Sequence, residues 1–126
     1  MKQEDILTWE IFLTKFPDEY ESVDYDFHIG KLDEHIATAE ESEIGGAQAV
    51  NQYKIDVVGY KNGRIDLIEV KNQAVPSAIG QLKMYKTLYD REIKPSMPTY
   101  PIIIARSQTP FMSETCKSEG ILLILV

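Results

Sequence analysis

The sequence predicts an α/β protein with a central mixed β-sheet flanked by helices. Segments with helical spacing of apolar residues alternate along the chain with β-rich segments. The pair Asn62-Gly63 separates two β-rich runs, which is the strongest short-range signal for an antiparallel hairpin. Two wholly apolar runs, residues 102–105 and 121–126, are typical of strands buried on both faces of a sheet, as parallel strands are. Antiparallel and parallel pairing together indicate a mixed sheet in an α/β sandwich.

The first half of the chain is expected to hold one helix and one strand before the hairpin. Residues 1–16 are expected to form a helix that ends before Pro17, with an apolar stripe made of Ile6, Trp9, Leu13 and Phe16. Residues 23–29 alternate between apolar and polar side chains, which is typical of a strand with one polar face. Residues 31–50 are acidic and then glycine-rich, and a helix, a long loop and a mobile flap all remain open there.

The second half supplies the hairpin and two further helix–strand units. Ser77 is a plausible N-cap for the helix that follows the hairpin, and Gly120 is a typical stop for the last helix. The expected elements are strands over 53–60 and 65–70, a helix over 77–89, a strand over 102–105, a helix over 109–118 and a strand over 121–126. The predicted order is therefore α-β-β-β-α-β-α-β, within one domain over residues 1–126.

Composition restricts the class of protein. The chain has 126 residues, of which 44% are hydrophobic and 26% charged, as in ordinary soluble domains. No apolar run is long enough to cross a membrane, and the acids among the first residues argue against a signal peptide. Cys116 is the only cysteine, so no internal disulfide can form, and we expect a reducing, cytoplasmic setting.

The net charge of −7 is distributed unevenly along the chain. Residues 1–50 contain 13 acidic and three basic side chains, whereas residues 51–126 contain ten basic and seven acidic ones. A phosphate backbone attracts a basic surface, so the total alone argues against nucleic acid. The basic second half leaves DNA possible as a partner, with weak and salt-sensitive binding by the isolated chain.

The hairpin places charged side chains together on one face. If Asn62 and Gly63 form the turn, Asp56 lies opposite Glu69, and Lys71 shares the face of Glu69. Opposed like charges are unfavourable, and the apolar neighbours in both strands make the site partly desolvated. A hard divalent cation such as Mg²⁺ would compensate the two carboxylates. Two carboxylates, a metal and an ammonium suit hydrolysis of a phosphodiester by a metal-bound water, with Lys71 orienting or activating that water.

These residues also resemble a known family. Asp56 followed by Glu69-Val70-Lys71 is similar to the D…(D/E)xK core of the PD-(D/E)XK nuclease superfamily, and Ile55 stands where the motif name has proline, as is common there. Gln81 and Tyr85 resemble the QxxxY motif of its RecB-like, Holliday-junction-resolvase-like branch. The motifs cover residues 53–89. The resemblance implies a restriction-endonuclease-like αβββαβ core and a Mg²⁺-dependent or Mn²⁺-dependent deoxyribonuclease.

The same resemblance implies roles for individual residues. Asp56, Glu69 and the backbone carbonyl of Val70 would bind the metal, and Lys71 would position or activate water. Gln81 and Tyr85 would support the site or touch DNA. Many members also carry a glutamate on the first helix, and Glu10 matches it by position, as a further metal ligand at the margin of the apolar stripe. Family members of this size act in restriction, repair, recombination or mobile elements, often as dimers or with partner proteins.

Two other functions stay open at the level of sequence. The chain could be a catalytically inactive nuclease-fold subunit that regulates or binds other proteins, such as an element-excision controlling factor. It could also be an acidic interaction protein that engages its partner through residues 31–50.

Overall fold

The structure of the protein is a computed structural model that describes residues 1–30 and 53–126. The expectations for residues 31–50 fall on residues outside the described part. The elements in chain order are α1 (Gln3–Lys15), β1 (Ser22–Ile29), β2 (Tyr53–Lys61), β3 (Arg64–Ala74), α3 (Ser77–Ile93), β4 (Thr99–Gln108), α4 (Met112–Ser118) and β5 (Leu122–Leu125). Each predicted helix and strand outside residues 31–50 is present, and β3, β4 and α3 are longer than the sequence pattern indicated.

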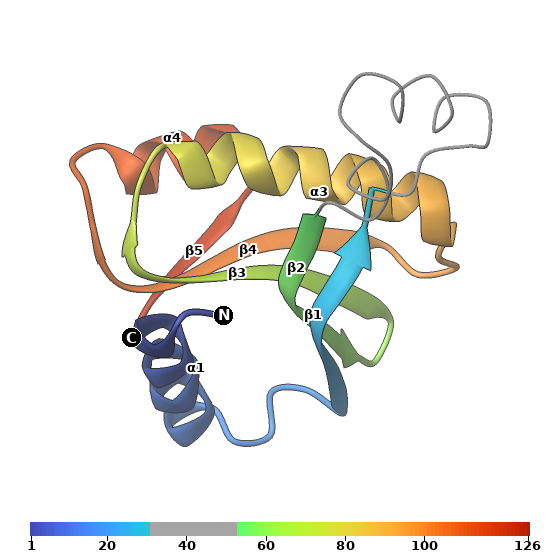
Figure 1. Ribbon diagram of the computed structural model, residues 1–126, viewed down its shortest axis with the longest axis horizontal. Coiled ribbons are helices and arrows are strands. Elements are labelled where there is room, and N and C mark those ends of the chain that lie inside the picture. The colour runs from blue at the N-terminus through green and yellow to red at the C-terminus, as the bar shows by residue number, and fades with distance from the viewer. Residues whose placement is uncertain (31–52) are drawn as a thin grey trace, which may run out of the picture.

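One mixed sheet contains all five described strands, in the order β1-β2-β3-β4-β5. β1 and β2 pair antiparallel, as do β2 and β3, whereas β3 pairs parallel with β4 and β4 with β5. Helix α1 packs against β3 and β4 on one face, and α3 and α4 cover the opposite face (Figure 1). The predicted fold class is thereby confirmed. None of the helices in the described ranges is long and apolar enough to cross a membrane.

Helix α1 buries a different stripe from the one expected. The sequence pattern placed Ile6 and Phe16 on the inner face, but both side chains are more than two-fifths exposed. The buried residues of the helix are Asp5, Thr8, Trp9 and Phe12. The helix is therefore rotated by about one residue from the expected setting, and an aspartate lies on its inner face. The rotation is consistent with tertiary contacts, since the Trp9 indole N–H donates to the Tyr25 hydroxyl at 3.0 Å.

The β2–β3 hairpin opens into a fork. Its paired residues run from Lys61 opposite Arg64 to Val57 opposite Ile68, which confirms the register that the Asn-Gly turn predicted. From Asp56 backwards, β2 no longer pairs with β3 and stays with β1, while β3 continues beside β4. In Figure 1 the β1–β2 pair rises toward α3 as β3 runs away from it. The fork leaves backbone groups of β3 without a ladder partner on β2, and side chains between the two strands can reach them.

Both strands of the β1–β2 pair change faces at this fork. Val23 packs on the α1 side of the sheet, but Phe27, four residues later, packs on the α3 side. Val57 and Ile55 likewise lie on opposite sides, although they are two residues apart. The backbone break is at Asp26, which has a φ of 49° and drops out of the ladder. The simple alternation expected over residues 23–29 is therefore wrong, because the strand twists sharply in its middle.

Candidate active site

The candidate site lies in the fork of the β2–β3 hairpin. Asp56 comes from β2, and Glu69 and Lys71 come from β3. The Asp56 side chain reaches across the fork, and its Oδ2 accepts a hydrogen bond from the backbone N–H of Val70 at 2.9 Å. This bond replaces a ladder bond where the strands part, so the carboxylate is fixed beside Glu69.

Glu69 is the least solvated charged group of the site, with only 2% of its surface exposed. Its Oε2 lies 3.6 Å from the Nζ of Lys71. Its Oε1 is buried and accepts no hydrogen bond. A buried acceptor without a partner destabilises the folded state, so this oxygen is well suited to act as a ligand for a cation.

The acid–base behaviour of the two carboxyls follows from this burial. Burial, and next the charge of Asp56, raise the pKa of Glu69 to about 8, against the opposing effects of Lys71 and the Asp56 backbone N–H. Burial also raises the pKa of Asp56, although the Val70 N–H and the Lys71 ammonium oppose it. Without a cation the pair therefore retains a proton at neutral pH, because two adjacent carboxylates in a desolvated site do not both ionise readily.

Helix α3 brings Gln81 and Tyr85 to the same site. The Gln81 amide Nε2 donates to the Tyr85 hydroxyl at 2.6 Å, and the tyrosine is buried. Burial, followed by the charge of Glu69, raises the pKa of the Tyr85 phenol. The two residues of the expected QxxxY pair therefore contact each other, and the phenol lies within electrostatic range of the carboxylates.

The acidic side chain that α1 directs toward the site is Asp5. It is buried, its Oδ1 accepts the backbone N–H of Asn72 at 2.9 Å, and its charge raises the pKa of Asp56. Glu10, the residue suggested by position in the sequence, is exposed. It lines a surface cavity of about 520 Å³ together with Gln3, Glu4, Ile6, Leu7 and Arg106.

The sequence contains a signal for Asp5, but the competing apolar stripe that includes Ile6 and Phe16 obscures it. The spacing of Asp5 to Thr8, Trp9 and Phe12 follows the i, i+3, i+4, i+7 pattern of a buried helix face. An acid on such a face points toward a polar partner inside the protein, here the backbone of Asn72.

Arg106 is a further residue that the sequence did not single out. It follows Ala105, which lies beside Lys71 in the parallel β3–β4 pair. Its guanidinium donates to the Thr8 hydroxyl at 3.1 Å and to the Glu4 backbone carbonyl at 3.4 Å. Among residues 1–30 and 53–126, no carboxylate lies within ion-pair distance of it. Arg106 therefore offers a positioned positive charge beside α1, one residue beyond the position that pairs with Lys71.

The donor set fits a hard divalent cation. Within the described residues no three or more His, Cys, Asp or Glu side chains converge on one point. Mg²⁺ is nevertheless commonly held by one or two carboxylates, with water and substrate phosphate completing the shell. The Asp56–Glu69 pair, with an unpartnered oxygen on Glu69, meets that requirement.

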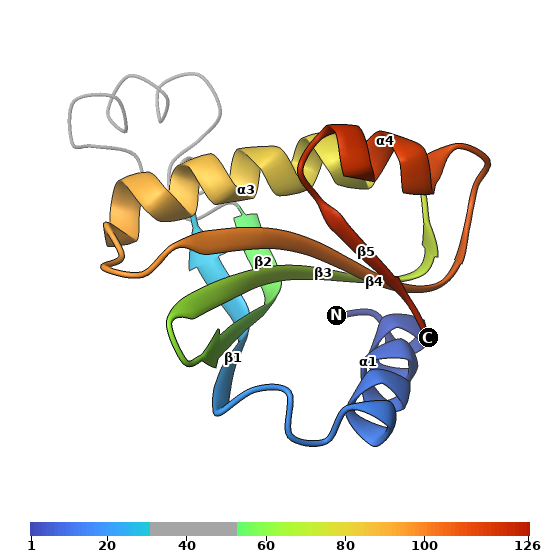
Figure 2. The same cartoon turned by 180° about the vertical axis from the view of Figure 1, so that it is seen from behind.

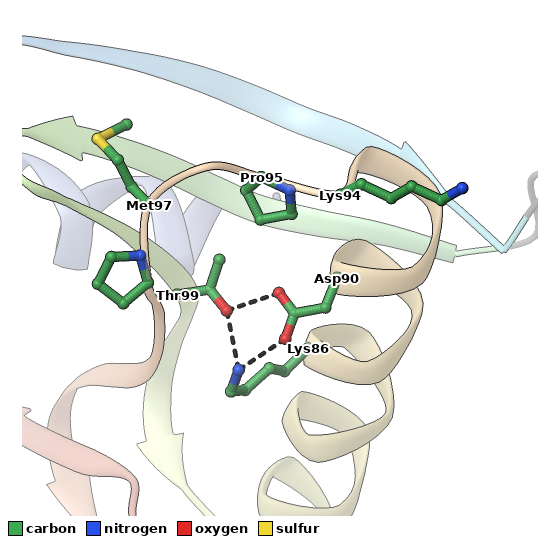
Figure 3. Close-up of a pocket in the computed structure, with 7 residues that line it drawn as sticks. Lys86, Asp90, Lys94, Pro95, Met97 and Thr99 are labelled. Carbon is green, nitrogen blue, oxygen red and sulfur yellow. Dashed lines mark hydrogen bonds and ion pairs between the residues drawn. The ribbon is translucent and has the colours of Figure 1, made fainter.

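A second cavity, of about 420 Å³, lies near the other end of α3 and is unrelated to this chemistry (Figure 3). Lys86 donates to Asp90 at 2.7 Å and to the Thr99 hydroxyl at 2.8 Å, and Thr99 donates to Asp90 at 2.6 Å. Its polar groups therefore satisfy one another and tie α3 to the start of β4.

Comparison with known proteins supports the fold. No protein-family model matches the sequence, and no significantly similar curated protein is found. Among solved structures, the chain resembles a repair endonuclease from Pyrococcus abyssi, with a TM-score of 0.61 and 19% sequence identity. The match covers 100% of this chain and 47% of that one, so the chain spans about half the length of the endonuclease. At this identity the likeness establishes that the two proteins share an α/β fold.

Proposed function

We propose that the protein is a metal-dependent deoxyribonuclease of the PD-(D/E)XK type, which hydrolyses phosphodiester bonds at the fork. The observation that carries this proposal is the buried Glu69 carboxylate, which has one oxygen without a partner and lies beside both Asp56 and Lys71. A folded protein does not gain stability from such a group, so a ligand-binding role explains it best. The fold shared with a repair endonuclease supports the same function.

The residues divide the work of the reaction. Asp56, Glu69 and the Val70 carbonyl would hold Mg²⁺ or Mn²⁺. The bound ion would offset the two negative charges, acidify a water and stabilise charge on the phosphate. Lys71, whose side chain is 31% exposed, reaches solvent from the buried pair and would orient the attacking water.

The surrounding residues fix this arrangement. Asp5 ties the backbone after Lys71 to α1 and adds negative charge near Asp56. Gln81 and Tyr85, both from α3, border the candidate site on that side and are hydrogen-bonded to each other. Arg106 would contact a phosphate of the DNA strand, since its guanidinium is held in place and no acid of the described residues neutralises it.

Metal binding and cleavage test the proposal together. We expect Mn²⁺ or Mg²⁺ at 100 times its dissociation constant to stabilise the wild type by about 2.7 kcal/mol. The double variant Asp56→Asn/Glu69→Gln should show no such rise in Tm. Lys71→Ala should retain the metal-dependent rise and lose cleavage of plasmid and branched DNA. Lys83→Ala is the matched control, because Lys83 pairs with Glu119 on the surface of α3 and should leave cleavage unchanged.

A wild-type protein that neither gains stability from the metal nor cuts any DNA form would contradict the proposal. A non-catalytic, regulatory nuclease-fold subunit is then the better candidate, and the absence of a third converging acid among the described residues favours it as the alternative. Either role is compatible with a homodimer or a partner protein, which size-exclusion chromatography with light scattering would measure.

A further inference from the structure

Phe111 is the most exposed large apolar side chain of the described residues, with 76% of its surface accessible. It immediately precedes α4 and has a φ of 69°, in the left-handed region. That conformation is unfavourable for a residue with a bulky side chain. A phenylalanine at this position therefore does not stabilise the fold, because its ring is not buried and its backbone conformation is strained.

The strained turn is nevertheless firmly held. The Phe111 carbonyl accepts two hydrogen bonds from Thr115, one from its backbone N–H at 3.1 Å and one from its side-chain hydroxyl at 2.7 Å. The backbone N–H of Thr109 donates to the Ala74 carbonyl at 3.0 Å, which ties the turn to the end of β3. The ring is thus presented from a fixed support, as a binding residue requires.

The surroundings of the ring are polar. The cavity beside it measures about 450 Å³ and is lined by Gln108, Thr109, Pro110, Phe111, Ser113 and Glu114. The Ser113 hydroxyl donates to the Gln108 side-chain oxygen at 2.8 Å, and the Thr109 hydroxyl to the Ala74 carbonyl at 3.4 Å. The Glu114 carboxylate has no hydrogen-bond or ion-pair partner among the described residues, so an apolar protein surface would desolvate it without compensation. A nucleobase offers a flat face for the ring and polar edges for its neighbours, so it suits this surface better.

The turn lies at the same end of β3 and β4 as the site. Ala105 pairs with Lys71, and Gln108 pairs with Ala74. Phe111 follows Ala105 by six residues, so the two are at most about 20 Å apart. Figure 2 shows the β4–α4 turn at the end of the sheet where the chain leaves β3 for α3. A DNA strand in the fork can reach the ring within a few nucleotides.

We propose that Phe111 is a base-stacking residue that takes an unpaired nucleobase of the DNA strand bound at the fork. The inference rests on the proposed nuclease function and adds a binding position outside the carboxylate site. A base can stack on the ring only if it is free of its partner strand. The protein should therefore bind DNA with unpaired bases better than fully paired duplex.

The test is binding without metal, which separates stacking from cleavage. The probe is a single-stranded oligonucleotide with one 2-aminopurine, whose fluorescence falls when the base stacks. Phe111→Ala should abolish the quench and weaken binding by about 5- to 150-fold, the range for loss of one stacked base. Phe111→Tyr keeps an aromatic ring and should retain both the fluorescence quench and the binding affinity. Phe16→Ala, which removes another exposed ring at the end of α1, is the matched control and should bind as wild type.

Stability serves as a second readout. Phe111→Gly removes the ring and relieves the left-handed strain, so its Tm should equal or exceed that of the wild type while the quench is lost. Lost binding then cannot be attributed to unfolding. The proposal is overturned if Phe111→Ala quenches as the wild type does, if fully paired duplex loses affinity to the same extent, or if the variant dissociates an oligomer and leaves DNA binding intact.

The two proposals fail in different ways. A Phe111-dependent quench in a protein that cuts no DNA would refute the nuclease and leave the stacking residue standing. Metal-dependent cleavage, together with a fluorescence quench that does not depend on Phe111, would support the nuclease and refute the stacking role of Phe111.

Discussion

Replacing Glu69 with glutamine should change how the stability of the metal-free protein depends on pH. Glutamine keeps the shape of the side chain and cannot ionise. In the wild type, the pKa of Glu69 rises from 4.5 to about 8 on folding, with burial as the first cause. Between these two values the native carboxyl keeps a proton that the unfolded chain has already released.

The size of the effect follows from linkage. A carboxyl with a raised native pKa contributes stability that is fully present below pH 4.5 and is lost as the pH rises toward 8. The loss is about 1.4 kcal/mol per pH unit inside this window. Because the native carboxyl is half ionised by pH 8, the wild type should lose about 2.3 kcal/mol more than Glu69→Gln between pH 6 and pH 8. For a chain of this size that corresponds to a drop in Tm of roughly 10 °C.

The assay is urea unfolding at pH 6 and pH 8 in the presence of a chelator, with Glu10→Gln as the control. Glu10 is exposed, so its removal should leave the wild-type pH dependence unchanged. Comparing slopes cancels the titrating groups that do not interact with Glu69, so the difference reports the Asp56–Glu69 pair. Equal slopes for the wild type and Glu69→Gln would refute the claim that this carboxyl is protonated in the metal-free site.

Three further substitutions test other parts of the structure. Gly59→Ala should cost about 1–3 kcal/mol, because the new Cβ would lie 2.6 Å from the Tyr20 ring, whose hydroxyl is hydrogen-bonded to a buried carboxylate; a wild-type urea midpoint would contradict this. Gly80→Ala, with no atom within 4 Å of its Cβ position, should instead stabilise α3 by about 0.5–1 kcal/mol in the same measurement. Asp5→Asn should lower the pKa of Asp56, because it removes a negative charge that raises it; a carboxyl ¹³C NMR titration measures this, and an unchanged pKa would exclude Asp5 from the site.

Local patterns in the sequence were enough to predict the order of elements and the hairpin register. An Asn-Gly turn closes with two residues, and this fixes every opposed pair as far as Val57 and Ile68. The same register places Asp56 on one strand of the hairpin and Glu69 and Lys71 on the other. These features depend on neighbours close in the chain, which is why they could be predicted.

The fork itself depends on the tertiary structure. Nothing in residues 23–29 or 53–60 indicates that both strands change faces in their middle, because the change accompanies packing against helices on both sides of the sheet. The fork puts the Asp56 side chain on the Val70 backbone in place of a ladder bond. It also leaves Glu69 with an unpartnered oxygen.

The sequence by itself determined the fold class, the strand pair and the carboxylates of the candidate site, because periodicity and turn chemistry act over short distances. Only the tertiary structure decided which acid of α1 turns inward. Successive helix residues point about 100° apart, so a small rotation exchanges inner and outer positions. The contact that accompanies the observed setting, Asp5 to Asn72, joins residues 67 positions apart in the chain. Such a contact exists only once the helix has packed on the sheet.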